Sequence, residues 1–369
     1  MKENTVGFLW RDPGLVHKFK AAVCLHGHTM YSEECLDFLP RYLKHVPGVS
    51  RLVEDCERRG ALNFARAYWT PPLTPASALS LEEEQIADLG LRPMISLTDH
   101  DNIEAPIALQ VTAAREDIPA SVEWTAPYYR AILHLGIHNL PQAQARRWMA
   151  IMAAYTAAPE ESRLPSILSE LSNLPDVLTV LNHPFWLEEG VVEDDRHFAV
   201  DRLLRECGDY LHAFELNGTR KWHENAATIE LAHAHSRPVI SGGDRHACEP
   251  AACLNLTNAT SFREFVAEVR AGISTVLFLP HYREPMAVRI LEAAWQILRP
   301  YPEHLGRERW TDRVFYRNQD GVAHSLSTVW KDRVPWLVRP VTGMLQLCAM
   351  RGVRPALRFL LSDRAELLP

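Results

Sequence analysis

The sequence predicts an α/β barrel with seven strands and an α-helical C-terminal extension. Short runs rich in β-forming residues alternate with segments of helix length, which is typical of a sheet covered by helices. The runs are almost continuously apolar, as expected for parallel strands buried on both faces. They also end in histidine, aspartate, glutamate or asparagine. Functional groups lie at the carboxyl ends of the strands in barrels of this type, so the pattern indicates a site there.

The seven runs share a polar or charged residue at or just after their last apolar position. They cover residues 23–25, 94–97, 120–122, 131–133, 177–181, 213–216 and 239–241, and the residues near their ends include His26, His100, Glu123, His134, His183, Asn217 and Asp244. An open doubly wound sheet would gather its site at one switch point. The spread of these groups over every strand end therefore favours the barrel.

Helix-length segments separate the runs. They cover residues 81–89, 105–114, 142–155, 165–172, 198–207, 225–234 and 261–271, and the last leads into an extended run at 274–279. The gap between the first two strands, about 36–92, is too long for an ordinary loop. It is predicted to be an insertion, either one that shapes the mouth of the site or one that only elaborates packing.

This organisation predicts a barrel over residues 1–285, including the insertion, and an extension over 286–369. The extension is basic, contains tryptophans, and has helix-period segments at 286–298 and 336–350. The pattern leaves open whether its apolar surface packs on the barrel, contacts a second copy of the chain or lies on a membrane surface. A homo-oligomer formed through the extension is one of these predictions.

Composition narrows the class of protein. The chain has 369 residues, of which 47% are hydrophobic, so a substantial core is available. A net charge of −7 argues against binding long nucleic acid by bulk electrostatics. No run approaches the roughly 18 apolar residues that a transmembrane segment needs. Seven cysteines without a Cys-x-x-Cys pair indicate reduced thiols, and we expect a cytoplasmic protein.

The segment His26-Gly27-His28 is the strongest local indication of a metal site. Side chains at positions i and i+2 of an extended segment share one face, and Glu33 and Glu34 follow in the next loop. In a chain with 17 histidines, such a pair alone is more often solvated or part of a core. The recurrence of ligand-type residues at other strand ends favours the metal site.

An ordered set of motifs extends this pattern along the chain. It consists of His26-Gly27-His28-Thr29-Met30-Tyr31-Ser32-Glu33, Thr98-Asp99-His100-Asp101, Glu123, His134, Asn182-His183-Pro184, Glu215-x-Asn217-Gly218 and Gly243-Asp244-Arg245-His246. The set resembles the signature of the PHP (polymerase and histidinol phosphatase) family of metal-dependent phosphoesterases, over about residues 20–280. The resemblance implies a distorted seven-stranded (β/α)7 TIM-like barrel.

The resemblance also implies two or three divalent metal ions, of zinc, manganese or iron, which accept imidazole and carboxylate ligands. The implied ligands are His26, His28, Glu123 and Asp244 for the first ion, Glu123, His134 and His183 for the second, and Glu33, His100 and His246 for the third. Two positions depart from the family pattern. Glu33 stands where aspartate is usual, so Glu34 beside it is an alternative ligand, and Arg245 stands where a small residue is common.

The predicted reaction is hydrolysis of a phosphate ester by a hydroxide that bridges two metal ions. Asp244, His246 and Glu123 are the predicted catalytic residues, and the expected substrate is a small phosphorylated metabolite or nucleotide. Arg245 either clamps the substrate phosphate or turns away into a salt bridge. Arg220 is a second candidate for phosphate binding, and it and its neighbours Lys221 and His223 could equally form a solvated loop.

Two other functions compete with this one. An amidohydrolase-like hydrolase usually has a metal-bridging lysine on its fourth strand, where this chain has His134. A non-catalytic metal-binding PHP module would be expected to have lost ligands, and none is plainly missing. Among the neighbouring residues, we expect Asp99 to orient His100, Asp101 to cap a helix and His138 to be peripheral.

Overall fold

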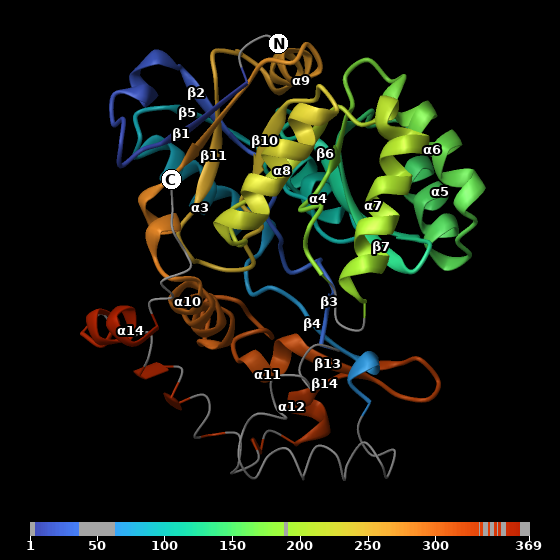
Figure 1. The fold of residues 1–369 in the computed structure, drawn as a ribbon. Helices are drawn as coiled ribbons and strands as arrows, with labels where there is room; N and C mark the ends of the chain where they lie inside the picture. The colour runs from blue at the N-terminus through green and yellow to red at the C-terminus, as the bar shows by residue number, and fades with distance from the viewer. Residues whose placement is uncertain are drawn as a thin grey trace.

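The computed structural model describes residues 4–36, 63–187 and 191–331, and beyond 331 only short pieces, of which 352–361 is the longest. The described chain is a mixed α/β protein with two five-stranded sheets in its main body (Figure 1). The first sheet has the order β1 (Asn4–Phe8), β12 (Ser274–Phe278), β11 (Cys253–Thr257), β2 (Ala21–Cys24), β5 (Arg92–Ile95). The second has the order β10 (Val239–Gly242), β9 (Ala213–Asn217), β8 (Leu178–Leu181), β7 (Ala131–Leu140), β6 (Ala120–Tyr128). The predicted α/β class is confirmed.

The two sheets meet at the carboxyl ends of their strands. Isolated bridges pair Gly27, after β2, with Arg245, after β10, and His100, after β5, with Glu123 on β6. The backbone N–H of Asp244 donates to the His26 carbonyl at 2.9 Å, and that of His28 donates to the Arg245 carbonyl at 2.8 Å. Among the described residues, the continuous ladders do not close into a barrel. These bridges and backbone hydrogen bonds lie where the predicted site residues are, and further hydrogen bonds join β10 to β11 and β12 through Asn255 and Ser274.

The expectation of a parallel strand followed by a helix is wrong in the middle of the fold. β6 and β7 form an antiparallel hairpin, and β7 is also antiparallel to β8. The connection contains only Tyr129, with φ 52°, and Arg130, which is far too short for a parallel crossover. His134 therefore lies near the start of its strand, and the reversed direction of β7 brings it to the same edge of the sheet as the other strand ends.

Helices pack around the two sheets. They are α3 (Pro75–Ala87), α4 (Glu104–Thr112), α5 (Ala145–Ala157), α6 (Leu164–Ser172), α7 (Glu193–Cys207), α8 (Trp222–Ala234) and α9 (Phe262–Arg270), with short 3-10 turns η1 (Leu15–Lys18), η2 (Phe64–Arg66), η3 (Glu161–Arg163), η4 (Gly208–Tyr210) and η5 (Pro280–Arg283). α9 shows how the sequence produces this packing. Phe262, Phe265, Val266 and Val269 recur at helical spacing, and all four are buried in the core cluster that includes β2, β8 and β10. The seven predicted helices are present, with shifted ends.

The insertion and the C-terminal extension form a separate layer together. Its four-stranded sheet has the order β14 (Ala323–Ser325), β13 (Val314–Arg317), β4 (Ala67–Trp69), β3 (Glu34–Cys35). Figure 1 shows this sheet below the main body, near α10 (Met286–Leu298), α11 (Trp310–Arg313) and α12 (Leu326–Val329), with α14 (Arg354–Leu361) beside α10. α10 agrees with its prediction. The extension is not purely helical, however, because β13 pairs with β4 from the insertion.

Parts of two predictions fall outside the described residues: most of the helix expected at 336–350, and residues 37–62 of the insertion. Within the described part of the chain, none of the helices combines the length and apolar character that crossing a bilayer requires.

Candidate metal centre

Glu123 lies at the centre of a buried group of imidazoles. Its Oε2 atom is 2.9 Å from His26 Nε2, 3.5 Å from His28 Nε2 and 3.4 Å from His100 Nδ1. Its Oε1 atom is 3.1 Å from His183 Nε2 and 3.3 Å from His134 Nδ1. The two oxygens thus face different sets of histidines, which is the arrangement that a carboxylate needs to bridge two cations.

The first set includes the four residues predicted for the first ion. His26 Nε2 and His28 Nε2 are 3.1 Å apart, and Asp244 Oδ1 is 3.8 Å and 3.5 Å from them, respectively. Ligand atoms that share one ion at about 2.0–2.2 Å are themselves roughly 3–4 Å apart. The observed spacing agrees with this, so the four side chains fit a divalent cation.

The second set consists of His134, His183 and the Oε1 atom of Glu123. Among the described residues, neither His134 Nδ1 nor His100 Nδ1 has a hydrogen-bond partner, although both atoms are buried and face Glu123. Unsatisfied ring nitrogens aimed at a carboxylate are costly in a folded protein unless a further group joins them. A cation between these atoms would satisfy both.

The third set contains Glu34 and not Glu33, which corrects the prediction from sequence. Glu34 Oε2 is 3.5 Å from His100 Nε2 and 3.4 Å from His246 Nε2. Glu33 has a side chain that is 53% exposed and forms an ion pair with Arg317 on β13. Successive side chains of an extended segment point to opposite faces, so only one of the two glutamates can turn toward the site.

The electrostatics of the cluster indicate that it lacks positive charge. Burial opposes protonation of His26, but Glu123, Glu215 and Asp244 outweigh burial and raise its pKa well above the usual value. Glu34 likewise overcomes burial and raises the pKa of His246 to about 9. Burial opposes ionisation of Glu123, yet the surrounding histidines hold its pKa well below its ordinary range. A bound cation would take the place of protons on these imidazoles, because protonation of a ligand competes with metal binding.

Other histidines of the cluster are held neutral. Burial, followed by the charge of His246, lowers the pKa of His28 to about 4. Burial also lowers the pKa of His183 to about 3. Neutral imidazole is the form that ligates a metal, so these two rings are ready to bind at neutral pH.

A ring of polar residues orients these side chains. Glu215 Oε2 lies 2.7 Å from His26 Nδ1 and thereby directs Nε2 into the cluster. Gly242 permits this contact, because a Cβ atom there would lie 2.2 Å from the Glu215 carboxylate. Ser32 contacts both His28 Nδ1, at 3.2 Å, and Glu34 Oε1, at 2.6 Å. The roles of Glu215 and Ser32 were missed from sequence, although both lie within the motifs, because a motif does not show which members touch one another.

Asp244 is held in a strained conformation by three donors. Its φ is 50°, a left-handed value that costs about 1–3 kcal/mol outside glycine. Its Oδ2 atom accepts hydrogen bonds from Asn217 at 3.1 Å, Thr219 at 2.9 Å and Arg220 at 3.3 Å. Its Oδ1 atom is therefore left facing the histidines.

The two predicted phosphate-binding arginines have different surroundings. Arg245 is buried, forms an ion pair with Glu82 at 2.6 Å and donates to the Glu249 carbonyl at 2.9 Å. It points away from the metal ligands, so the phosphate clamp is wrong and the alternative salt bridge is correct. Arg220 lines the cavity over the cluster, lies over the Trp186 ring at 5.0 Å, and has a buried Nε with no hydrogen-bond partner.

Other predictions near the site had mixed outcomes. Asp99 accepts hydrogen bonds from the Thr29 N–H, at 2.5 Å, and hydroxyl, at 2.7 Å, instead of orienting His100. Asp101 accepts from the Thr125 N–H at 2.9 Å and does not cap a helix. His138 is buried against the Ser96 hydroxyl and is absent from the potential metal-binding groups of the described residues, as expected for a peripheral residue.

The loop after β9 leads directly into a helix. Lys221 is the N-cap of α8, and His223 lies exposed in the first turn of this helix. Of the three basic residues in this segment, Arg220 is the one that reaches the cavity.

The cavity over the cluster has a volume of about 270 Å³. Its lining includes Glu34, His100, Glu123, His134, His183, Trp186, Thr219, Arg220, Asp244, His246 and Ile290. Six predicted ligands, which come from five strands, and the substrate candidate Arg220 therefore share one open space. A small anion in this space would contact the metal-binding groups and a fixed positive charge together.

Comparisons with known proteins find distant structural similarity. No family model matches the sequence, and no curated protein matches it. PsfC from Pseudomonas syringae is 12% identical with a TM-score of 0.39, and the match covers 74% of this chain and 98% of PsfC. An amidohydrolase from Chromobacterium violaceum is 14% identical with a TM-score of 0.36, covering 61% and 88% of the two chains. A proposed metal-dependent phosphoesterase from Bifidobacterium adolescentis is 13% identical with a TM-score of 0.34, covering 55% and 92%. Similarity at this level does not assign an activity.

Proposed function

We propose that the protein is a PHP-like, metal-dependent phosphoesterase that hydrolyses a small phosphorylated metabolite or nucleotide. The observation that carries the proposal is Glu123, whose two oxygens face separate sets of histidines at 2.9–3.5 Å. The two isolated bridges beside this residue support treating the two sheets as a distorted seven-stranded barrel.

Divalent ions bound here would supply Lewis acidity, which lowers the pKa of water and offsets charge on phosphoryl oxygens. Hydrolysis adds a water oxygen to phosphorus, breaks the ester P–O bond and returns a proton to the departing alcohol. Asp244 is the base that we assign to the water proton, since its Oδ1 atom faces the ligands while its Oδ2 atom is held by Thr219 and its neighbours. In a form that binds two ions and leaves the third set empty, His246 is the proton donor that we assign to the alcohol, because Glu34 favours its protonated form.

Arg220 favours a phosphate substrate over an amide. A guanidinium carries a positive charge and presents planar donors that match phosphate oxygens. It lines the same cavity as the ligand cluster and has an unsatisfied Nε atom. A neutral amide substrate would gain less from this fixed charge. Among the described residues that line this cavity there is also no lysine, unlike the usual amidohydrolase pattern.

Metal content and hydrolysis together test the proposal. Protein purified without chelator or a nickel column is expected to contain two or three equivalents of zinc, manganese or iron. Each metal form should then be assayed against aryl phosphate monoesters, aryl diesters, nucleotides and sugar phosphates. Hydrolysis of at least one class, abolished by chelator and restored by metal, supports the assignment. Less than one equivalent of metal, or no hydrolysis by any form, would overturn it.

A further inference from the structure

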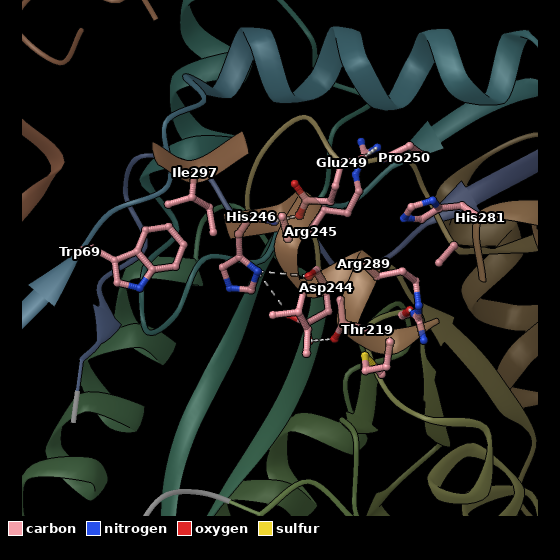
Figure 2. Close-up of a pocket in the computed structure, with 16 residues that line it drawn as sticks. Trp69, Thr219, Asp244, Arg245, His246, Glu249, Pro250, His281, Arg289 and Ile297 are labelled. Carbon is pink, nitrogen blue, oxygen red and sulfur yellow. Dashed lines mark hydrogen bonds and ion pairs between the residues drawn. The ribbon is translucent and has the colours of Figure 1, made fainter. Parts of the chain in front are cut away.

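A second cavity adjoins the metal-lined cavity and differs from it in chemistry. Its volume is about 150 Å³, and its lining is mostly apolar. The two cavities share Thr219, Asp244, His246 and Ile290. Figure 2 shows Trp69 and Ile297 on one flank of His246 and Arg289 and His281 on the other. The second space therefore lies directly beside the metal centre.

One face of α10 forms an apolar wall of the second cavity. Met286, Ile290, Ala293 and Ile297 all line it, and their spacing of four, three and four residues places them on one side of the helix. Ile290, where the two cavities meet, is 56% exposed although it is a large apolar residue. Trp69 from β4 completes the wall, with its ring 5.6 Å from that of His246.

The arginines that reach this cavity are already paired. Arg245 binds Glu82 and the Glu249 carbonyl. Arg289 donates to the carbonyls of Gly218, Arg220 and Glu284, and so ties α10 to the loop that carries Thr219. The donors of both guanidiniums are thus engaged within the protein, Arg245 by a carboxylate and Arg289 by carbonyl oxygens. The cavity therefore suits a neutral organic group.

We propose that this apolar cavity binds the alcohol portion of the substrate, which carries one ring or an aliphatic group of similar size. The inference rests on the proposed function and narrows its substrate class, away from sugar phosphates and nucleotides. An apolar cavity of about 150 Å³ is the size that accepts benzene. The phosphate would lie beside Arg220 and the metal ligands, and the ring would lie against Trp69 and Ile290.

Paired ligands that differ only in the ring test this inference on the metal-loaded full chain. Calorimetry would compare the dissociation constants of benzylphosphonate and methylphosphonate, neither of which can be hydrolysed. In a separate assay, kcat/KM would be measured for benzyl phosphate and methyl phosphate. Burial of the ring should favour the benzyl compound by about tenfold to a hundredfold in both measurements. Ala293→Leu, which fills the cavity, should reduce this ratio toward one, and Ala294→Leu, one residue along the same helix, is the matched control. Ile290→Ser changes an exposed position and is a second test with little risk to folding.

Each result separates the two proposals. Equal binding of the benzyl and methyl compounds by the wild-type chain would overturn the ring site, even if both esters were hydrolysed. A benzyl preference that survives both Ala293→Leu and Ile290→Ser would overturn its location. Preferential benzyl binding that both variants remove, without hydrolysis of either ester, would support the ring site and overturn the phosphoesterase function.

Discussion

Asp244 and Arg245 are neighbours in sequence, yet they belong to two buried charge clusters of different kinds. The Arg245 cluster is neutralised from within, because its guanidinium pairs with Glu82 at 2.6 Å. The Asp244 cluster contains carboxylates and histidines but has little fixed positive charge, and raised pKa values of His26 and His246 supply it instead. Buried carboxylates need a cation in both cases. Where one arginine neutralises one carboxylate, as Arg245 does for Glu82, the cluster supports the fold. Where several carboxylates have only Arg220 as a fixed cation, the cluster can bind metal.

The largest expected effect comes from removing charge on the metal-binding side. Asp244→Asn should lower kcat by about a thousandfold or more, because it removes both a proposed ligand and the proposed base. Steady-state hydrolysis of the best substrate from the screen would measure this. Asp209→Asn, at a fully exposed side chain, is the control. An Asp244→Asn protein as active as the wild type would contradict the assignment of Asp244 as a metal ligand and base.

Changes in the Arg245 cluster should affect the free energy of unfolding. Arg245→Met leaves Glu82 buried and unpaired, and this should lower the free energy of unfolding by about 3–5 kcal/mol. Replacing both partners, as Arg245→Met with Glu82→Leu, should recover much of the loss. Denaturant unfolding of the two single variants and the double variant measures the coupling. Additive losses would show that the pair is not a neutralising unit.

Arg220 should affect substrate binding more than the chemical step. Arg220→Gln is expected to raise KM for the phosphate ester by about tenfold to a hundredfold, the range for one charge-assisted hydrogen bond. Arg220→Lys keeps the charge but not the planar donors, so it should restore the function only in part. Lost kcat with unchanged KM would instead assign Arg220 to holding Asp244.

Glu33 and Glu34 are a second pair of neighbours in which one residue belongs to the metal-binding cluster and the other pairs with an arginine. Glu34→Gln should reduce bound metal by about one equivalent, because it removes the carboxylate between His100 and His246. Glu33→Gln should leave metal content unchanged, since Glu33 pairs with Arg317. Elemental analysis of both proteins decides the matter. Loss of metal from the Glu33 variant alone would restore the original prediction from sequence.

The smallest expected effect is on the pH dependence of stability, and it comes from His212, a histidine outside the metal cluster. Burial, then Arg270 and Arg237, lowers the pKa of His212 to about 3, and its Nδ1 atom accepts the Thr179 N–H at 3.0 Å. The unfolded chain takes up this proton near pH 6.5, whereas the folded chain resists until about pH 3. Stability should therefore fall as pH decreases through this window. His212→Asn should flatten the slope by up to about one proton, as measured by unfolding at a series of pH values. An unchanged slope would assign the acid sensitivity elsewhere.

The strand ends were predictable because apolar runs and their polar ends are local features. His26, Glu123 and Asp244 could be placed together for that reason. The direction of Arg245 was not predictable, since it depends on Glu82 from a distant helix. The choice of Glu34 over Glu33 depends on which face of a short strand meets the site. The strands β13 and β4 were missed because neither is long enough to show a pattern, and each is stabilised by the other.

The pairing of β4 with β13 sets the order in which the protein can become complete during synthesis. Trp69 and its partner Val314 lie far apart in the chain, so the ribosome must have made the chain past residue 314 before they can meet. Contacts of such high sequence separation form slowly, because the entropy of closing the long loop comes first. The early strands and the His26 segment emerge long before then. A nascent chain can thus expose the His26 segment before β13 and the wall formed by α10 have been made.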